Sequence, residues 1–288
     1  METHQPAARN LQLSMQPRIQ ADVRSGHNVR EPHARNYISR FKYVFQFRQF
    51  RRTARRVGHQ LLHALIPGRC TLCLASTNRN IDLCIGCEED LPWHGRVCRQ
   101  CGLPIPVGDR CGTCIAKPPP FSTTRFSFLY QPPIPGLITR FKFGGDRVAG
   151  RVLSELLARQ CEHLWSDDRP DVLVPVPLHR RRRRTRGFNQ AELIAQSLSA
   201  STQIPVDPGL CRRIVDSPPQ SGLTARERRS NLIRAFEASP RLRGRRIAIV
   251  DDVMTTGSTV SAVAREVARA GASNIEVVCI ARTVHRKW

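Results

Sequence analysis

The chain has 288 residues, enough for one α/β domain of ordinary size and a smaller unit. Its 46 Lys and Arg residues outnumber 23 Asp and Glu residues, which gives a net charge of +23. This excess favours an anionic partner such as nucleic acid, a nucleotide or an acidic membrane surface, although a solvated basic surface is the alternative. The sequence has neither an apolar run that spans a bilayer nor an apolar signal core, so we expect a cytoplasmic protein.

The first 66 residues differ in composition from the rest of the chain. Residues 1–36 are polar and show no apolar period, so we expect them to be disordered. Residues 37–66 combine aromatic and apolar side chains with many arginines, a pattern that fits a basic amphipathic helix. This extension either lies on nucleic acid or an anionic membrane, or is an over-long gene start with no selected role.

Eight of the 11 cysteines form four Cys-x-x-Cys pairs within 45 residues. In a chain expected to be cytoplasmic, paired thiols at this density favour zinc over disulfides. Four thiolates complete one tetrahedral zinc ion, so eight predict two closed four-cysteine sites with a structural role. The pairs are Cys70/Cys73, Cys84/Cys87, Cys98/Cys101 and Cys111/Cys114.

The order of these pairs leaves two groupings open. Consecutive grouping places the first two pairs on one zinc ion and the last two on another, as in a double zinc ribbon over residues 67–116. Interleaved grouping, first with third and second with fourth, is the alternative. This segment has few large apolar residues, so we expect metal to supply most of its stability. The remaining cysteines, Cys161, Cys211 and Cys279, are predicted to be buried core thiols.

A stiff Lys-Pro-Pro-Pro segment at 117–120 separates the cysteines from a domain predicted over residues 121–288. Strand and helix patterns alternate along this domain. The alternation predicts an α/β fold with a parallel sheet flanked by helices. We expect strands at 126–130, 171–176, 247–250 and 275–280, and helices at 134–143, 148–165, 190–200 and between Gly257 and Gly271.

The strand at 247–250 leads into two acids and then a loop of small residues that opens a helix. The loop residues are Thr255, Thr256, Gly257, Ser258 and Thr259. Backbone N–H groups and hydroxyls converge at such a helix N-terminus and favour a phosphate. Asp251 and Asp252 can accept hydrogen bonds from a vicinal diol or bind hydrated Mg²⁺. A sugar phosphate fits both parts, and an ordinary turn whose side chains only cap the helix is the alternative.

The segment after the strand at 171–176 should belong to the same pocket, because ligands in open α/β sheets lie beyond the carboxyl ends of the strands. Here a Pro-Val-Pro-Leu turn that contains Pro177 precedes five consecutive arginines at 180–184. Guanidinium groups make bidentate contacts to phosphate, so we expect one or two of these arginines to contact pyrophosphate. The others are predicted to form a solvated basic face.

The stretch from Arg246 to Val260 resembles the phosphoribosyl-pyrophosphate (PRPP) motif of type I phosphoribosyltransferases. It has that motif's apolar strand, two acids, two apolar residues and Thr-Thr-Gly-Ser-Thr loop. With the paired cysteines upstream, further motifs make the chain similar to the ComF family over about residues 68–283. These motifs are Pro175-Val176-Pro177-Leu178, Arg186-Gly187-Phe188-Asn189-Gln190, Gln220-x-x-Leu223, Arg228-x-x-Asn231 and Ala235-Phe236.

The resemblance implies a type I phosphoribosyltransferase fold that binds PRPP with Mg²⁺. For some members it also implies a role in the uptake of single-stranded DNA, alongside other competence proteins. Asp251 and Asp252 would be the catalytic acids at the ribose hydroxyls, and residues 255–259 would bind the 5′-phosphate. The residues implied to approach the pyrophosphate or to form a loop over the site are Pro177, Arg186, Gly187, Asn189 and Gln190.

Three hypotheses about function remain open at this point. The protein transfers a phosphoribosyl group to an acceptor that no residue identifies; or it binds single-stranded DNA as a competence factor, with PRPP as a ligand; or it senses PRPP without turnover. The basic extension also leaves membrane association open.

Overall fold

The computed structural model describes residues 68–165, 168–179, 183–184, 187–215 and 235–284. These residues all lie within one compact unit, Gln60–Trp288. The predictions for the 1–66 extension, for Arg186 and for the motifs between 220 and 231 fall outside the described residues. Among the residues that are described, no helix is both long and apolar enough to cross a membrane.

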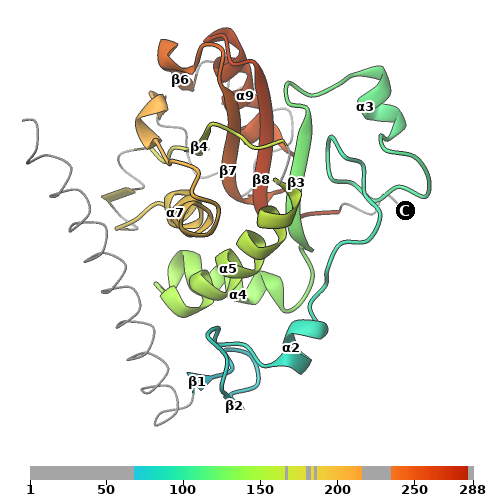
Figure 1. Cartoon of the computed structure of the whole chain (residues 1–288), viewed down its shortest axis with the longest axis vertical. Helices are drawn as coiled ribbons and strands as arrows, with labels where there is room; N and C mark the ends of the chain where they lie inside the picture. Colours follow the sequence, from blue (N-terminus) through green and yellow to red (C-terminus); the bar gives the residue numbers. More distant parts are fainter. Residues whose placement is uncertain (1–67, 166–167, 180–182, 185–186, 216–234, 285–288) are drawn as a thin grey trace, which may run out of the picture. The chain divides into compact units, whose positions relative to one another are not determined.

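A four-stranded parallel sheet forms the centre of this unit, with the strand order β3-β8-β7-β4 (Figure 1). Every neighbouring pair of strands is parallel, so the carboxyl ends of all four strands meet at one edge of the sheet. The strands are β3 (Thr123–Leu129), β4 (Val172–Pro175), β7 (Arg246–Met254) and β8 (Asn274–Arg282).

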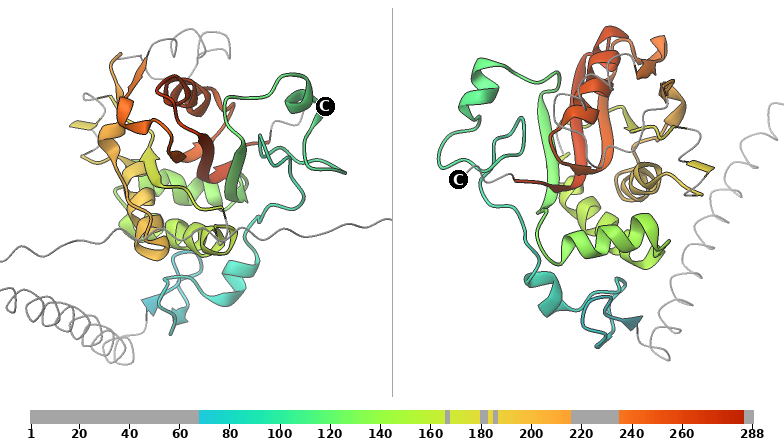
Figure 2. Two further views of the ribbon diagram at one scale, coloured as in Figure 1. Left: turned by 45° about the horizontal axis from the view of Figure 1, so that its top comes forward. Right: turned by 180° about the vertical axis from the view of Figure 1, so that it is seen from behind.

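Helices cover both faces of the sheet, with α9 on one side and α4, α5 and α7 on the other (Figure 2). Ile247 and Ile249 of β7 pack in the cluster that contains the α9 valines, whereas Ala248 and Val250 pack with the opposite helices. Because both faces are buried, the strand is apolar at successive positions. The helices are α4 (Ile134–Phe143), α5 (Arg147–Leu164), α7 (Gln190–Thr202) and α9 (Ser258–Arg269).

The predicted strands and helices of this domain are all present, and α4 has the predicted bounds. Strand β7 is longer than predicted, because β8 continues to Arg282 and pairs with Val253 and Met254. The two acids therefore lie within β7, and the prediction that they follow the end of the strand is wrong. The lone thiols are buried as predicted: Cys161, Cys211 and Cys279.

Several short elements complete the described structure. Strands β5 (Cys211–Arg213) and β6 (Phe236–Ala238) pair antiparallel, with Cys211 opposite Ala238. This pairing was not predicted from the sequence. Two short helices begin directly after cysteines, at Cys84 and Cys111. The short elements are β1 (Gly68–Arg69), β2 (Ser76–Thr77), α2 (Ile85–Glu89), α3 (Gly112–Ala116), the 3-10 turns Pro208–Leu210 and Pro240–Leu242, β5 (Cys211–Arg213) and β6 (Phe236–Ala238).

The cysteine-rich segment, residues 68–116, contacts the α/β domain at two places. Its first half lies on α4 and α5, where Arg140 Nη1 donates to the Thr71 carbonyl at 3.0 Å and Arg151 pairs with Asp82 at 2.6 Å. Its second half follows the free edge of β3, where the Thr124 N–H donates to the Arg99 carbonyl at 2.9 Å. The segment is therefore packed against the domain on both halves.

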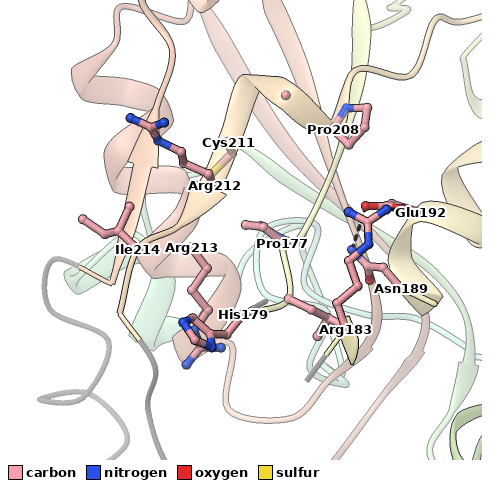
Figure 3. Close-up of a pocket in the computed structure, with 12 residues that line it drawn as sticks. Pro177, His179, Arg183, Asn189, Glu192, Pro208, Cys211, Arg212, Arg213 and Ile214 are labelled. Carbon is pink, nitrogen blue, oxygen red and sulfur yellow. Dashed lines mark hydrogen bonds and ion pairs between the residues drawn. The ribbon is translucent and has the colours of Figure 1, made fainter. Parts of the chain in front are cut away.

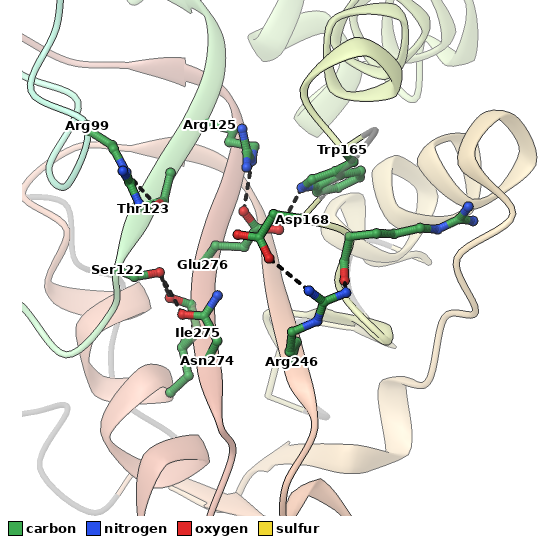
Figure 4. Close-up of polar contacts among 11 residues, drawn as sticks. Arg99, Ser122, Thr123, Arg125, Trp165, Asp168, Arg246, Asn274, Ile275 and Glu276 are labelled. Atoms are coloured by element: carbon green, nitrogen blue, oxygen red, sulfur yellow. Dashed lines mark hydrogen bonds and ion pairs between the residues drawn. The ribbon is translucent and has the colours of Figure 1, made fainter. Parts of the chain in front are cut away.

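A buried carboxylate holds the elements together at the amino ends of the strands (Figure 4). Glu276 of β8 accepts from Arg125 Nε of β3 at 2.8 Å and from Trp165 Nε1, just after α5, at 2.6 Å. Burial raises the pKa of Glu276, and the Arg125 guanidinium opposes that shift. These contacts fix β3, β8 and α5 at the end of the sheet opposite the acids of β7.

Candidate functional site

The two acids of β7 have defined orientations. The Asp252 N–H donates to Asp251 Oδ1 at 2.9 Å, and the Val253 N–H donates to Asp252 Oδ1 at 2.7 Å. The other oxygen of Asp252 lies 2.8 Å from Lys142 Nζ, near the end of α4. This arrangement holds two carboxylates and one ammonium group together at the carboxyl edge of the sheet.

The electrostatic environment of Asp251 disfavours its ionised form. Desolvation raises the pKa of this carboxyl to about 7, the Asp252 carboxylate adds to the shift, and the Lys142 ammonium opposes it. These surroundings therefore favour the protonated form of Asp251 more than water does. A cation or a hydrogen-bond donor at this position would favour the carboxylate.

The predicted phosphate loop leads from β7 into α9. Gly257 has a left-handed φ of +74°, and a Cβ there would lie 2.8 Å from Met254 Cε, so both backbone and packing favour glycine. The Thr256 and Ser258 hydroxyl oxygens are 2.8 Å apart, and the Ser258 N–H donates to Thr256 Oγ1 at 3.3 Å. Thr255 and Thr256 are exposed, while Ser258 and Thr259 are half-buried. The loop therefore offers hydroxyls to solvent at the N-terminus of a helix.

Asn189 and Gln190, at the start of α7, are buried. Asn189 caps α7 by accepting from the Ala191 N–H at 3.1 Å, and its amide donates to the Val176 carbonyl at 3.1 Å. Gln190 donates to the Lys142 carbonyl at 3.5 Å, and Gly187 has a left-handed φ of +76°. In this structure Asn189 and Gln190 connect β4, α7 and α4, and so help to place Lys142 beside Asp252.

A cavity of about 670 Å³ lies next to Pro177 and the start of α7 (Figure 3). Its charged lining residues are three arginines and one glutamate. Two of the arginines have acidic partners: Arg183 lies 3.3 Å from Glu192, and Arg212 lies 2.9 Å from Glu237. The structure thus places Pro177 and Asn189 at this cavity, whereas Asp251, Asp252 and the loop are not among its lining residues. The lining residues are Pro177, Leu178, His179, Arg183, Asn189, Glu192, Pro208, Gly209, Cys211, Arg212, Arg213 and Ile214.

The eight paired cysteines form two clusters in consecutive order, so the interleaved grouping is excluded. Within each cluster the four sulfur atoms lie within 4.8 Å of one another. Backbone N–H groups donate to sulfur in both clusters, from Cys87 to Cys84 at 3.4 Å and from Cys111 to Cys98 at 3.3 Å. The clusters are Cys70, Cys73, Cys84 and Cys87 (first cluster), and Cys98, Cys101, Cys111 and Cys114 (second cluster).

One thiol in each cluster is acidified. Burial raises the pKa of Cys70, but N–H groups of Cys73, Cys84 and Leu72 outweigh it and lower the pKa to about 6. The same balance, with N–H groups of Cys101, Cys111 and Gln100, lowers the pKa of Cys98 to about 7. Backbone N–H groups therefore favour the thiolate form of one cysteine in each cluster, and four sulfurs in this arrangement fit a tetrahedral zinc ion.

Two residues of the site were not predicted. Lys142 contacts Asp252, and Arg282 at the end of β8 donates to the Met254 carbonyl, directly before the loop, at 2.9 Å and contacts the Thr255 carbonyl in the loop. The available signal for Arg282 was an arginine directly after an apolar strand, at the edge where parallel strands place their ligands. Nothing in the local sequence distinguished Lys142 from the other basic residues.

Comparison with known proteins agrees with this architecture. A double zinc ribbon domain matches residues 61–115, and a phosphoribosyl transferase domain matches residues 150–287. With the parallel sheet and the two four-cysteine clusters, these matches define the class: a phosphoribosyltransferase fold preceded by a double zinc ribbon.

Similar proteins are named for DNA utilization and competence. DNA utilization protein YhgH of Escherichia coli O157:H7 is 36% identical over 76% of this chain and 99% of its own length. Competence protein F of Haemophilus influenzae is 33% identical, over 69% and 90% respectively. Competence protein ComFC of Bacillus subtilis is 28% identical, over 64% and 76%. The chain belongs to the ComF family, as the sequence motifs predict.

Proposed function

We propose that the chain binds PRPP with Mg²⁺ at the carboxyl edge of the sheet. The observation that carries this proposal is the pair of oriented carboxylates beside Lys142, directly before a hydroxyl-rich loop that opens α9. PRPP has a vicinal diol, a 5′-phosphate and a pyrophosphate. Asp251 and Asp252 match the diol and the metal, and residues 255–259 match the 5′-phosphate.

The same site supports transfer of the phosphoribosyl group. In that reaction the bond from C1 to the pyrophosphate oxygen breaks, the electron pair leaves with pyrophosphate, and an acceptor forms the new bond to C1. Positive charge develops on the ribose ring, and carboxylates placed near the ring stabilise it. Mg²⁺, when bound, neutralises the leaving pyrophosphate. The acceptor is unknown, and binding without transfer would make the protein a PRPP sensor.

The two four-cysteine clusters support structural zinc. Each has four sulfurs close together and no further ligand position, which suits stabilisation of a fold rather than catalysis. Because both halves of the ribbon contact the α/β domain, zinc would also stabilise those contacts.

Binding of single-stranded DNA is the second candidate, and the cationic cavity of Figure 3 favours it. Arg183 and Arg212 are 60% and 72% exposed. Phosphates of a bound strand would replace Glu192 and Glu237 as the ion-pair partners of these arginines. Relatives named for DNA utilization and competence make this candidate relevant to the chain. The two candidates use different surfaces and are compatible with each other.

The first prediction concerns PRPP. Calorimetric titration with PRPP and Mg²⁺ should give one site per chain, and Asp251→Asn or Asp252→Asn should weaken binding about tenfold or more. The reason is that a hydrogen bond to a charged group contributes about 1.5–3 kcal/mol. The control is Glu162→Gln, which changes an exposed carboxylate on α5 and should leave the affinity unchanged.

Turnover is measured on the same samples as pyrophosphate release with a panel of nitrogenous bases. Release above the Asp251→Asn background identifies a transferase, whereas binding without release from any acceptor identifies a sensor. Absence of PRPP binding by the wild-type chain would contradict the proposal.

The second prediction concerns single-stranded DNA. Because contacts to phosphate release counterions, affinity for an oligonucleotide should fall steeply as salt rises, and Arg212→Gln should weaken it. The matched control is Arg269→Gln on α9, since Arg269 is similarly exposed and also pairs with a glutamate. Affinity that does not change with salt would contradict binding by charge, and equal effects of both variants would exclude the cavity as the DNA site.

The third prediction concerns metal. Elemental analysis of the purified chain should find two zinc ions, and Cys70→Ser and Cys98→Ser should each lose one, because the two clusters share no ligand. One zinc ion per wild-type chain would contradict two independent sites.

A further inference from the structure

Arg282 joins the second cysteine cluster to the proposed phosphate loop. Its side chain is 4% exposed at the carboxyl end of β8. Nε donates to the Cys101 carbonyl at 2.9 Å, and Nη1 donates to the Met254 carbonyl at 2.9 Å. Nη1 also contacts the carbonyls of Thr255 and Thr283. One buried guanidinium group therefore touches a cluster residue and the back of the loop.

These contacts determine which way the loop amides point. In a planar trans peptide the C=O and N–H bonds point in opposite directions. Because Arg282 draws the carbonyls of Met254 and Thr255 towards itself, the N–H groups of Thr255 and Thr256 point away from it. Thr255 and Thr256 are exposed residues, so the loop itself is accessible to a ligand.

The charge of Arg282 strengthens these hydrogen bonds. Its bonds go to carbonyl oxygens, and in the described part of the chain no carboxylate lies within ion-pair distance of it. Desolvation lowers the pKa of Arg282, and the thiols of Cys279, Cys101 and Cys114 oppose that shift, because as thiolates they offset part of its charge. Arg282 therefore acts on the loop mainly by orienting its carbonyls through charge-assisted bonds.

The other end of Arg282 is fixed by the metal-binding turn. The Gly102 N–H donates to the Cys98 carbonyl at 2.8 Å, and the Cys98 N–H donates to the Leu103 carbonyl at 2.7 Å. Gly102 has a left-handed φ of +70°, and a Cβ there would lie 2.8 Å from Phe126 Cε1. The turn that carries the Cys101 carbonyl thus packs closely on β3. The first half of the ribbon, which carries the first cluster, contacts α4 and α5 instead, through Thr71 and Asp82.

We propose that Arg282 is a positioning residue for the phosphate loop and couples metal in the second cluster to phosphate affinity. The proposal rests on the PRPP site proposed above and adds a cause for the orientation of its loop. The Cys101 carbonyl holds Arg282, and Arg282 holds the loop carbonyls. Because coupling between two binding sites is reciprocal, phosphate at the loop should also raise the affinity of the second cluster for zinc.

The test measures binding of ribose 5-phosphate and of PRPP with Mg²⁺ to the zinc-loaded full chain by calorimetry. Arg282→Gln should weaken ribose 5-phosphate about tenfold or more, because several charge-assisted bonds are lost. Arg282→Lys should be intermediate, since it keeps the charge but not the planar set of donors. Arg125→Gln is the control: it removes a partly buried arginine at the opposite end of the sheet and should leave the affinity unchanged.

The equilibrium distribution of zinc between the chain and a chromogenic chelator is the second readout. Saturating ribose 5-phosphate should raise the affinity of the wild type for one of its two zinc ions, and this zinc should be the one absent from Cys98→Ser. In Arg282→Gln this gain should disappear, while the affinity for the other zinc stays the same.

The outcomes separate the two proposals. A wild-type chain that binds neither ligand would contradict the PRPP site itself. A wild type that binds ribose 5-phosphate, together with an Arg282→Gln chain of equal affinity, would overturn the role of Arg282 and leave the PRPP site standing. If Arg282→Gln does not fold, Arg282→Lys decides by the same comparison, and wild-type affinity in that variant overturns the inference.

Discussion

The parallel pairing of β7 with β8 is the constraint on which the site depends. The two strands pair up to Met254 and Arg282, so the acids of β7 and the arginine of β8 reach the same edge of the sheet. Both faces of β7 are buried, which leaves this edge as the place where its polar residues can meet a ligand. The loop, the acids and Arg282 take their positions from this single register.

The ribbon is part of the scaffold of the domain. Its first half is bonded to α4 and α5, and α4 supplies the lysine that pairs with Asp252. Its second half reaches the loop through Arg282. The first half therefore contacts the helix that carries Lys142, and the second half contacts Arg282 directly.

Much of this could be predicted from the sequence, where local patterns determine local structure. The β-branched run before Asp251 predicts a strand buried on both faces, and Gly257 marks the turn into α9. The spacing of the cysteines leaves two ways to group the four Cys-x-x-Cys pairs into metal sites, and only the folded structure distinguishes consecutive from interleaved grouping. The extension of β7 through its acids could not be predicted, because it depends on β8, which follows only after the whole of α9.

The remaining parts of the site arise from contacts between residues that are distant in sequence. Lys142 meets Asp252 because α4 and α7 pack on the face of the sheet that carries Ala248, Val250 and Asp252, and no local pattern records that packing. The pairing of β5 with β6 joins two three-residue segments, which are too short for a periodic signal. Asn189 and Gln190 were implied as ligand residues by family resemblance, and their buried bonds to the backbone appear only in the folded chain.

The central claim is that residues 251–259 form the PRPP site. The most direct measurement is a crystal structure of the chain with PRPP and Mg²⁺. We predict the 5′-phosphate within hydrogen-bond distance of the N–H groups of residues 255–259, and the ribose hydroxyls on the carboxylates of Asp251 and Asp252. A PRPP molecule in the cavity beside Pro177 and Arg212, with the loop empty, would contradict the claim.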